Sequence, residues 1–130
     1  MKKIITLVVF LLIARAGSAQ SEVKASFGTL PYDEKNIHSG TIEQILANPK
    51  IILNNKSYHV DSFFVSFLPA QPADLVGPFT IAGDKLSPRI MNSLRDMGGK
   101  KGILFIDNVM VSASGGKRIV TNNVLVKYTR

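Results

Sequence analysis

The chain has 130 residues, no cysteine, and a formal net charge of +7 from 16 Lys and Arg residues against 9 Asp and Glu residues. The lack of cysteine excludes disulfide bonds, thiol catalysis and a lipid-anchored lipoprotein, which needs an acceptor cysteine. The basic residues are scattered and do not form a face interleaved with aromatics, so we expect a solvated, mildly basic surface and no nucleic-acid partner.

The first 19 residues have the pattern of a secretory signal peptide. A basic start is followed by the apolar run Ile4–Ile13 and by the small residues Gly17 and Ala19, which predicts cleavage after Ala19. A spanning helix needs roughly 20 apolar residues, and Arg15 interrupts this run, so we expect no membrane span after cleavage. Cleavage removes three basic residues and lowers the net charge to +4. Export without cysteine favours the bacterial periplasm, with the cell surface or secretion as alternatives.

Residues 20–47 are predicted as an N-terminal arm that precedes the main domain. Thr41 and Gln44 form a weak capping box, which predicts one or two helical turns that Asn48-Pro49 ends. A short apolar cluster predicts either an edge strand or an unstructured arm, and its members are Val23, Ala25 and Phe27.

Residues 58–68 are rich in β-branched and aromatic side chains, which predicts a strand. The alternation changes phase, so we expect either a bulge near Asp61-Ser62 or a strand buried on both faces. Its aromatic bulk exceeds what a one-sided strand needs, and Phe63, Phe64 and Phe67 are therefore candidates for a partner-binding surface. The alternative is that a helix later in the chain covers them.

The clearest helix is predicted over residues 87–97. Ser87 is a favourable N-cap, Pro88 suits the first helical position, and Gly98 supplies the C-terminal stop. The side chains expected to share the apolar face of this helix are Ile90, Leu94 and Met97.

The last third of the sequence predicts a β-hairpin. Gly115 and Gly116 fit a two-residue turn whose central positions need positive φ. Lys117 and Arg118 follow as a basic tip that an acidic partner could contact. Alternation places one set of side chains on a single face, namely Ile103, Phe105, Val109, Val111 and Ala113.

Asp107-Asn108 interrupts the first strand of this hairpin. Such a polar pair indicates a solvent-facing position, a bulge, or a polar mark on a binding face.

The sequence contains no motif that predicts catalysis, a metal site or a cofactor site. His59 and Asp61 share a face on a regular strand, but no nucleophile elbow occurs, and a hydrolase would need a serine within about 3 Å of His59. Two histidines without matching carboxylate spacing do not predict a metal site. The glycines of "DMGGKKG" follow a helix and so meet the wrong end of its dipole for a phosphate cradle.

Several segments carry a resemblance to a known family from about Asn48 to the end. They are "VDSFFVSF", "GDKLSPRIMNSLRDMGGKKG", "ILFIDNVMVSASGGKR" and the closing "VLVKY". In order and pattern this region resembles the C-terminal periplasmic domain of the gliding-motility and type IX secretion protein GldM (PorM) of Bacteroidota. The resemblance implies an Ig-like β-sandwich, no enzymatic activity, and protein–protein contact in the cell envelope. The sequence lacks the transmembrane helix and preceding domains of full-length members, so we do not expect the motor stator itself.

These observations predict a mainly-β protein, either an Ig-like β-sandwich or a partly closed sheet with one covering helix. The predicted organisation is a signal peptide (1–19), an N-terminal arm (20–47) and a β-sandwich domain (48–130). The function expected is a non-enzymatic, exported module that binds an envelope protein, without a cofactor, and that is compatible with homo-oligomers. The alternative is a periplasmic or surface domain that binds a small ligand or glycan through Tyr58, His59, Asp107 and Asn108.

Overall fold

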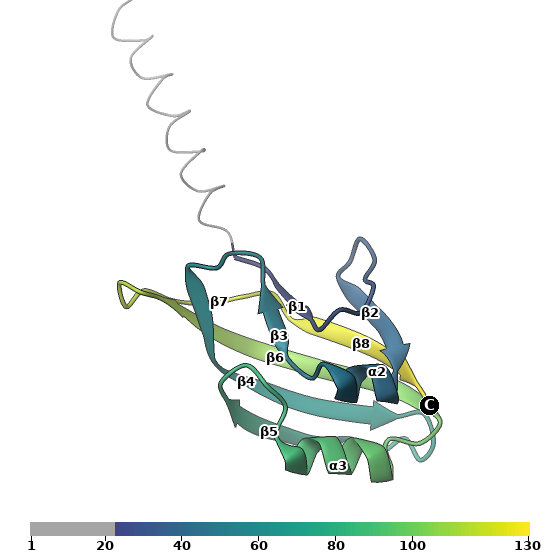
Figure 1. The fold of residues 1–130 in the computed structure, drawn as a ribbon. Helices are drawn as coiled ribbons and strands as arrows, with labels where there is room; N and C mark the ends of the chain where they lie inside the picture. Colours follow the sequence, from purple (N-terminus) through teal and green to yellow (C-terminus); the bar gives the residue numbers. More distant parts are fainter. Residues whose placement is uncertain (1–22) are drawn as a thin grey trace, which may run out of the picture.

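The computed structural model describes residues 23–130, and strands predominate in this range (Figure 1). The predicted mainly-β class is therefore confirmed. The predicted signal peptide (1–19) and residues 20–22 of the predicted arm lie outside the described residues. Within residues 23–130, no helix combines the length and the apolar character that crossing a bilayer requires.

A six-stranded, mostly open sheet organises the described part of the chain. Five strands run in the order β2-β8-β6-β4-β5, and β7 pairs with the far end of β6. The pairing is antiparallel except between β2 and β8, which are parallel. The strands are β2 (Ile37–Thr41), β4 (Tyr58–Pro69), β5 (Val76–Ala82), β6 (Lys101–Ala113), β7 (Arg118–Val120) and β8 (Val124–Thr129).

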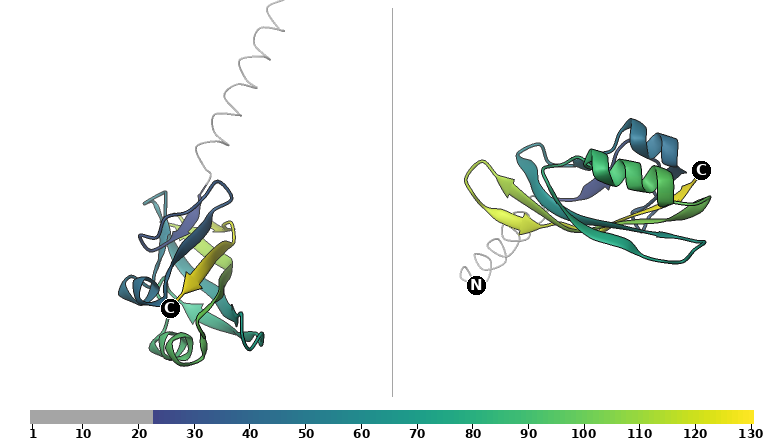
Figure 2. Two further views of the ribbon diagram at one scale, coloured as in Figure 1. Left: turned by 90° about the vertical axis from the view of Figure 1, so that its right-hand side faces the viewer. Right: turned by 90° about the horizontal axis from the view of Figure 1, so that it is seen from below.

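One face of this sheet carries the remaining elements. The helices α2 (Ile42–Ala47) and α3 (Pro88–Met97) lie on the same side of the sheet (Figure 2). The short strands β1 (Ala25–Phe27) and β3 (Ile51–Leu53) pair with each other and contribute to the same buried core. The cover is thus two helices and a two-stranded ribbon, where we expected one helix.

The ends of both helices follow the capping signals in the sequence. Ser87 Oγ accepts a hydrogen bond from the Ile90 N–H at 3.3 Å, and the Gly98 N–H donates to the Leu94 carbonyl at 2.9 Å. The predicted capping box is also present, because Thr41 and Gln44 exchange side-chain-to-backbone bonds. Capping of this kind satisfies backbone groups that have no partner inside a helix.

The core lies between the sheet and its cover. Ile90 and Leu94 of α3 are fully buried there, whereas Met97, the last residue of the helix, is 53% exposed and does not belong to the core. The Tyr128 hydroxyl of β8 donates to the Gly98 carbonyl at 2.8 Å and ties the end of α3 to the sheet. Burial of this hydroxyl raises the pKa of Tyr128.

The segment predicted as an N-terminal arm is integrated into this core. Ala25 and Phe27 of β1 are buried, and β2 is an edge strand of the large sheet. Of the two arrangements predicted for the cluster around these residues, the strand is observed. His38 links β1 to β2. It is a polar residue, and the hydrophobic pattern of the sequence does not indicate that it is buried.

His38 is completely buried and connects the cover to the sheet edge. The Phe27 N–H donates to His38 Nε2 at 3.1 Å, and the ring of Tyr32 lies 5.0 Å from the imidazole, centroid to centroid. Since Nε2 accepts, the proton of the neutral ring is on Nδ1, which is buried without a hydrogen-bond partner. Burial lowers the pKa of His38 from its ordinary value and favours this neutral form.

Candidate functional site

The other face of the sheet is covered by no helix or strand of residues 23–130, and we call it the open face (Figure 2). The strand β4 shows how the two faces divide. Phe63 and Phe67 are buried on the covered side, whereas Phe64 points to the open face and is 40% exposed. Ser66 and Leu68 follow Phe64 on the open face because successive strand residues point to opposite sides.

A bulge in β6 decides which of its side chains reach the open face. Asp107 pairs with Phe64 and Met110 pairs with Ser62, so β6 contains one more residue than β4 between these pairs. Asn108 lies at the bulge with φ of 51°, a left-handed conformation that asparagine tolerates. The bulge is one of the alternatives that the polar pair Asp107-Asn108 predicted.

This bulge overturns one prediction about the faces of β6. Leu104 and Ile106 are buried before the bulge, and Val109 and Val111 are buried after it. Ile103 and Phe105 therefore point away from Val109 and Val111, and the prediction that they share a face is wrong. Strict alternation along β6 gives the wrong face for Ile103 and Phe105, because the extra residue at the bulge shifts the inward–outward pattern by one position. The second bulge, predicted near Asp61-Ser62, is confirmed by the register shift between Val60 and Ser62.

Neighbouring strands align the outward side chains into rows across the open face. Ile103 pairs with Leu68 on one side and Lys127 on the other, and Phe105 pairs with Ser66 and Leu125. The result is a set of large apolar side chains on adjacent strands, which we call the open-face cluster: Phe64, Leu68, Ile103, Phe105 and Leu125. Contiguous apolar side chains on an uncovered sheet are typical of interaction surfaces.

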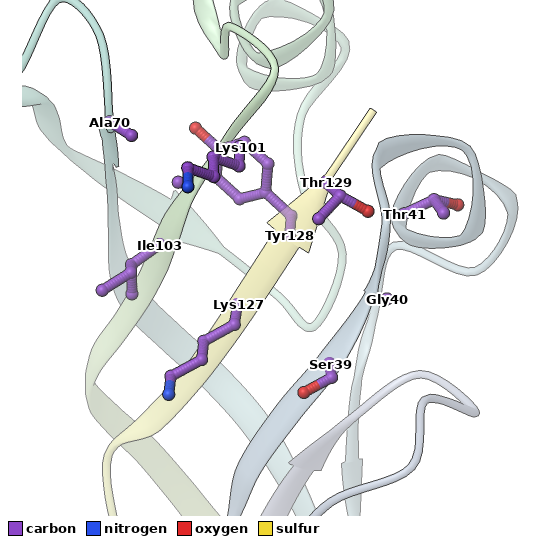
Figure 3. A pocket seen from close by; sticks show the side chains of 10 residues that line it. Ser39, Gly40, Thr41, Ala70, Lys101, Ile103, Lys127, Tyr128 and Thr129 are labelled. Carbon is purple, nitrogen blue, oxygen red and sulfur yellow. The ribbon is translucent and has the colours of Figure 1, made fainter.

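A basic hollow adjoins this cluster at the β2–β8–β6 end of the sheet. It has a volume of about 570 Å³ and is bordered by Lys101, Lys127, Ser39 and Thr129 (Figure 3). A second hollow shares Lys101 with it and is lined further by Lys100, Arg95 and Arg130, with Asp96 as the acidic residue of its lining. Basic side chains therefore gather at this end of the sheet, and those of Lys101 and Lys127 belong to the open face.

Polar side chains mark the opposite end of the open face. Ser112 Oγ lies 3.0 Å from His59 Nε2 and donates to Asp61 Oδ1 at 2.9 Å, and His59 Nε2 lies 3.0 Å from the same carboxylate oxygen. A serine within about 3 Å of His59 is what a hydrolase requires. In a hydrolytic triad, however, the serine and the carboxylate contact different ring nitrogens.

Here both partners contact Nε2, and the Ser112 proton is directed to Asp61 and not to the imidazole. The three side chains therefore bridge β4 and β6 beside the bulge without the relay of a triad. The side chain of His59 is 67% exposed, and Asp61 Oδ2 is buried without a hydrogen-bond partner.

The aromatic residues predicted as a partner-binding surface divide between the two faces. Phe63 and Phe67 are 1% and 0% exposed, so their assignment to a surface is wrong, and the alternative that the helix side covers them is correct. Phe64 alone of the three is available on the open face. The residues missed by sequence reasoning are the remainder of the open-face cluster and the two lysines of the basic hollow.

The predicted hairpin tip is present and exposed. Lys117 and Arg118 lie at its end, and the Gly116 N–H donates to the Ala113 carbonyl at 2.9 Å to close the turn. Gly116 has φ of +85°, whereas Gly115 does not have positive φ, so the prediction that both need it is wrong for Gly115. Pairing of Ser112 with Arg118 leaves a longer loop than the two residues expected, and such loops place one left-handed residue after a regular turn.

The residues of the alternative ligand-binding hypothesis do not converge. Tyr58 packs against the core from the covered side, whereas His59 pairs with Ser112 on the open face. Asp107 lies five residues along β6 from Ser112, which is roughly 17 Å on an extended strand. In the described residues, no cluster of three or more His, Asp or Glu side chains could hold a metal ion.

Comparison of the chain with protein-family models and with curated proteins found no match.

Proposed function

We propose that this protein is an exported, non-enzymatic protein–protein interaction module of the bacterial cell envelope, and that the open face is its docking surface. The observation that carries the proposal is the open-face cluster, five large apolar side chains on three adjacent strands of an uncovered sheet. The signal-peptide pattern supports export. The resemblance to the terminal domain of GldM supports an envelope role connected with gliding motility or type IX secretion.

The chemistry of the open face fits a protein partner. Its centre is apolar, while Lys101, Lys127 and Asp107 lie around that centre with His59 and Asp61 beyond. Protein interfaces commonly have this arrangement, in which an apolar core supplies most of the affinity and a polar rim sets orientation. The basic tip formed by Lys117 and Arg118 is a second contact point beyond this surface.

Site-specific photo-crosslinking in the native envelope tests this proposal. A photoreactive phenylalanine analogue is placed at Phe105 on the open face or, as the control, at Met97, which is 53% exposed on α3. We expect a covalent protein adduct from position 105 and none from position 97. Absence of any adduct at 105, or the same adducts from both positions, would reject the open face as a docking surface.

A further inference from the structure

The outward side chains of the central strand β6 have a pattern that is complementary to itself. In order along the strand they are Lys101, Ile103, Phe105 and Asp107, which is basic, apolar, apolar and acidic. Leu104 is the midpoint of this series. Reversing the strand about Leu104 exchanges the basic end with the acidic end and one apolar residue with the other.

We propose that the open face binds a second copy of this chain, so that two open sheets pack face to face as a sandwich. The two-fold axis lies between the sheets, at right angles to β6 and level with Leu104. This arrangement places Lys101 of one copy opposite Asp107 of the other, and Ile103 opposite Phe105. The inference rests on the proposed function, since both require the open face to be a docking surface.

The charges select this arrangement over the other simple two-fold packing. An axis parallel to β6 would place Lys101 opposite its own symmetry copy and Asp107 opposite its own, and facing like charges are destabilising. The antiparallel arrangement produces two Lys101–Asp107 pairs, one at each side of an apolar centre. Packed sheets lie about 10 Å apart, a gap that a lysine and an aspartate side chain can span together.

The remaining open-face residues are compatible with this packing. Leu68 and Leu125 flank Ile103 and Phe105 on the neighbouring strands and extend the apolar centre on both sides. Lys127 borders the basic hollow at the sheet edge, where its ammonium group can stay in water while its stem covers apolar surface. Within residues 23–130, neither Lys101 nor Asp107 forms an ion pair inside one copy, so both are available to a partner.

The footprint predicts a weak and reversible dimer. Five strands at about 4.8 Å spacing and seven residues of β6 give an area of roughly 24 by 20 Å, or about 500 Å² per copy. This is at the low end for specific protein interfaces, where association is transient. The described core is built from residues 23–128, so protein that begins at Gln20 contains all of it and is suitable for measurement.

Sedimentation velocity from about 10 µM to about 500 µM tests the proposal, since a weak interface of this size should populate monomer and dimer across that range. We expect reversible dimerisation, and we expect Lys101→Glu or Asp107→Lys alone to lower the association constant at least about tenfold by placing like charges opposite each other. Combining Lys101→Glu with Asp107→Lys restores the pairs with reversed sign, so the association constant should return to within about threefold of the original. Lys56→Glu, in the exposed turn between β3 and β4, makes the same charge change outside the interface and should have no effect.

Three results would overturn this inference. These are a monomer over the whole concentration range, a dimer that both single variants leave unchanged, and a double variant no better than the singles. Far-ultraviolet circular dichroism and thermal unfolding of each variant establish that it is folded, because surface substitutions of this kind change stability by only about 0.5 kcal/mol. A monomer that still gives a crosslink from position 105 to a different envelope protein would reject the dimer and retain the proposed function.

Discussion

The two faces of the large sheet contrast most clearly within β4, where adjacent residues of the same type have opposite environments. Phe63 and Phe67 are buried against the cover, whereas Phe64 is 40% exposed on the open face. The covered face is continuous with the cores of α2, α3 and β1, and it determines whether the chain folds. The open face has equally large apolar side chains without a cover, so its residues are free to serve binding.

Truncating one phenylalanine on each face should reveal the largest difference between the two faces, measured as the loss in the free energy of unfolding. Phe67→Ala leaves a cavity in the core, and we expect it to lower the free energy of unfolding by about 3–5 kcal/mol. Phe64→Ala should cost less than about 1 kcal/mol, because its side chain is already partly in water and leaves no cavity. Urea titration of both variants measures this, and equal losses would show that the open face belongs to the folding core.

The two histidines extend the comparison to pH, since His38 is buried on the covered side and His59 is exposed on the open face. Burial holds the pKa of folded His38 below the ordinary 6.5, so the unfolded chain binds more protons as the pH falls through that value. The stability from neutral His38 is complete above about pH 6.5 and is lost progressively below it. Protonation also removes the acceptor of the Phe27 N–H, and an unsatisfied buried donor costs about 1–3 kcal/mol.

Urea titrations at about pH 7.5 and about pH 5.5, on either side of the ordinary histidine pKa, test this effect. His38→Gln retains an acceptor for the Phe27 N–H but does not titrate, so it should reduce the loss of stability on acidification. His59→Gln is the matched control on the open face and should leave that loss in place. A loss that persists in His38→Gln would assign the pH dependence to another group.

Local signals in the sequence were sufficient for the helix ends and for the bulge in β4 near Asp61-Ser62. Ser87, Pro88 and Gly98 predict α3 because capping depends on residues adjacent in the chain. The phase change near Asp61-Ser62 predicts a bulge because polar residues displace the hydrophobic period there.

What the sequence did not reveal depends on partners distant in the chain. Alternation alone puts Ile103 and Phe105 on the face of Val109 and Val111. The polar pair Asp107-Asn108 is equally compatible with a regular solvent-facing position, and only the pairing of β6 with β4 establishes the bulge. Phe63 and Phe67 are buried in a core that also contains Ile90 and Leu94 of α3, about twenty residues later in the chain. The sequence of β4 itself does not show which of its aromatic side chains face that core. His38 looks like a loop residue in the sequence and becomes buried because β2 pairs with β8 almost ninety residues later.

The smallest change in the free energy of unfolding that we predict comes from the N-cap of α3, one of the two helices that cover the sheet. Ser87→Ala removes the oxygen that accepts from the Ile90 N–H at the start of α3, and loss of such a cap costs about 1 kcal/mol. Ser39→Ala deletes the same hydroxyl from an exposed site on the open face and should change the free energy of unfolding by less than about 0.5 kcal/mol. Urea titration of the two variants measures the difference. If both lose the same amount, the cap does not stabilise the cover, and α3 is held by the packing of Ile90 and Leu94 and by the Tyr128–Gly98 hydrogen bond alone.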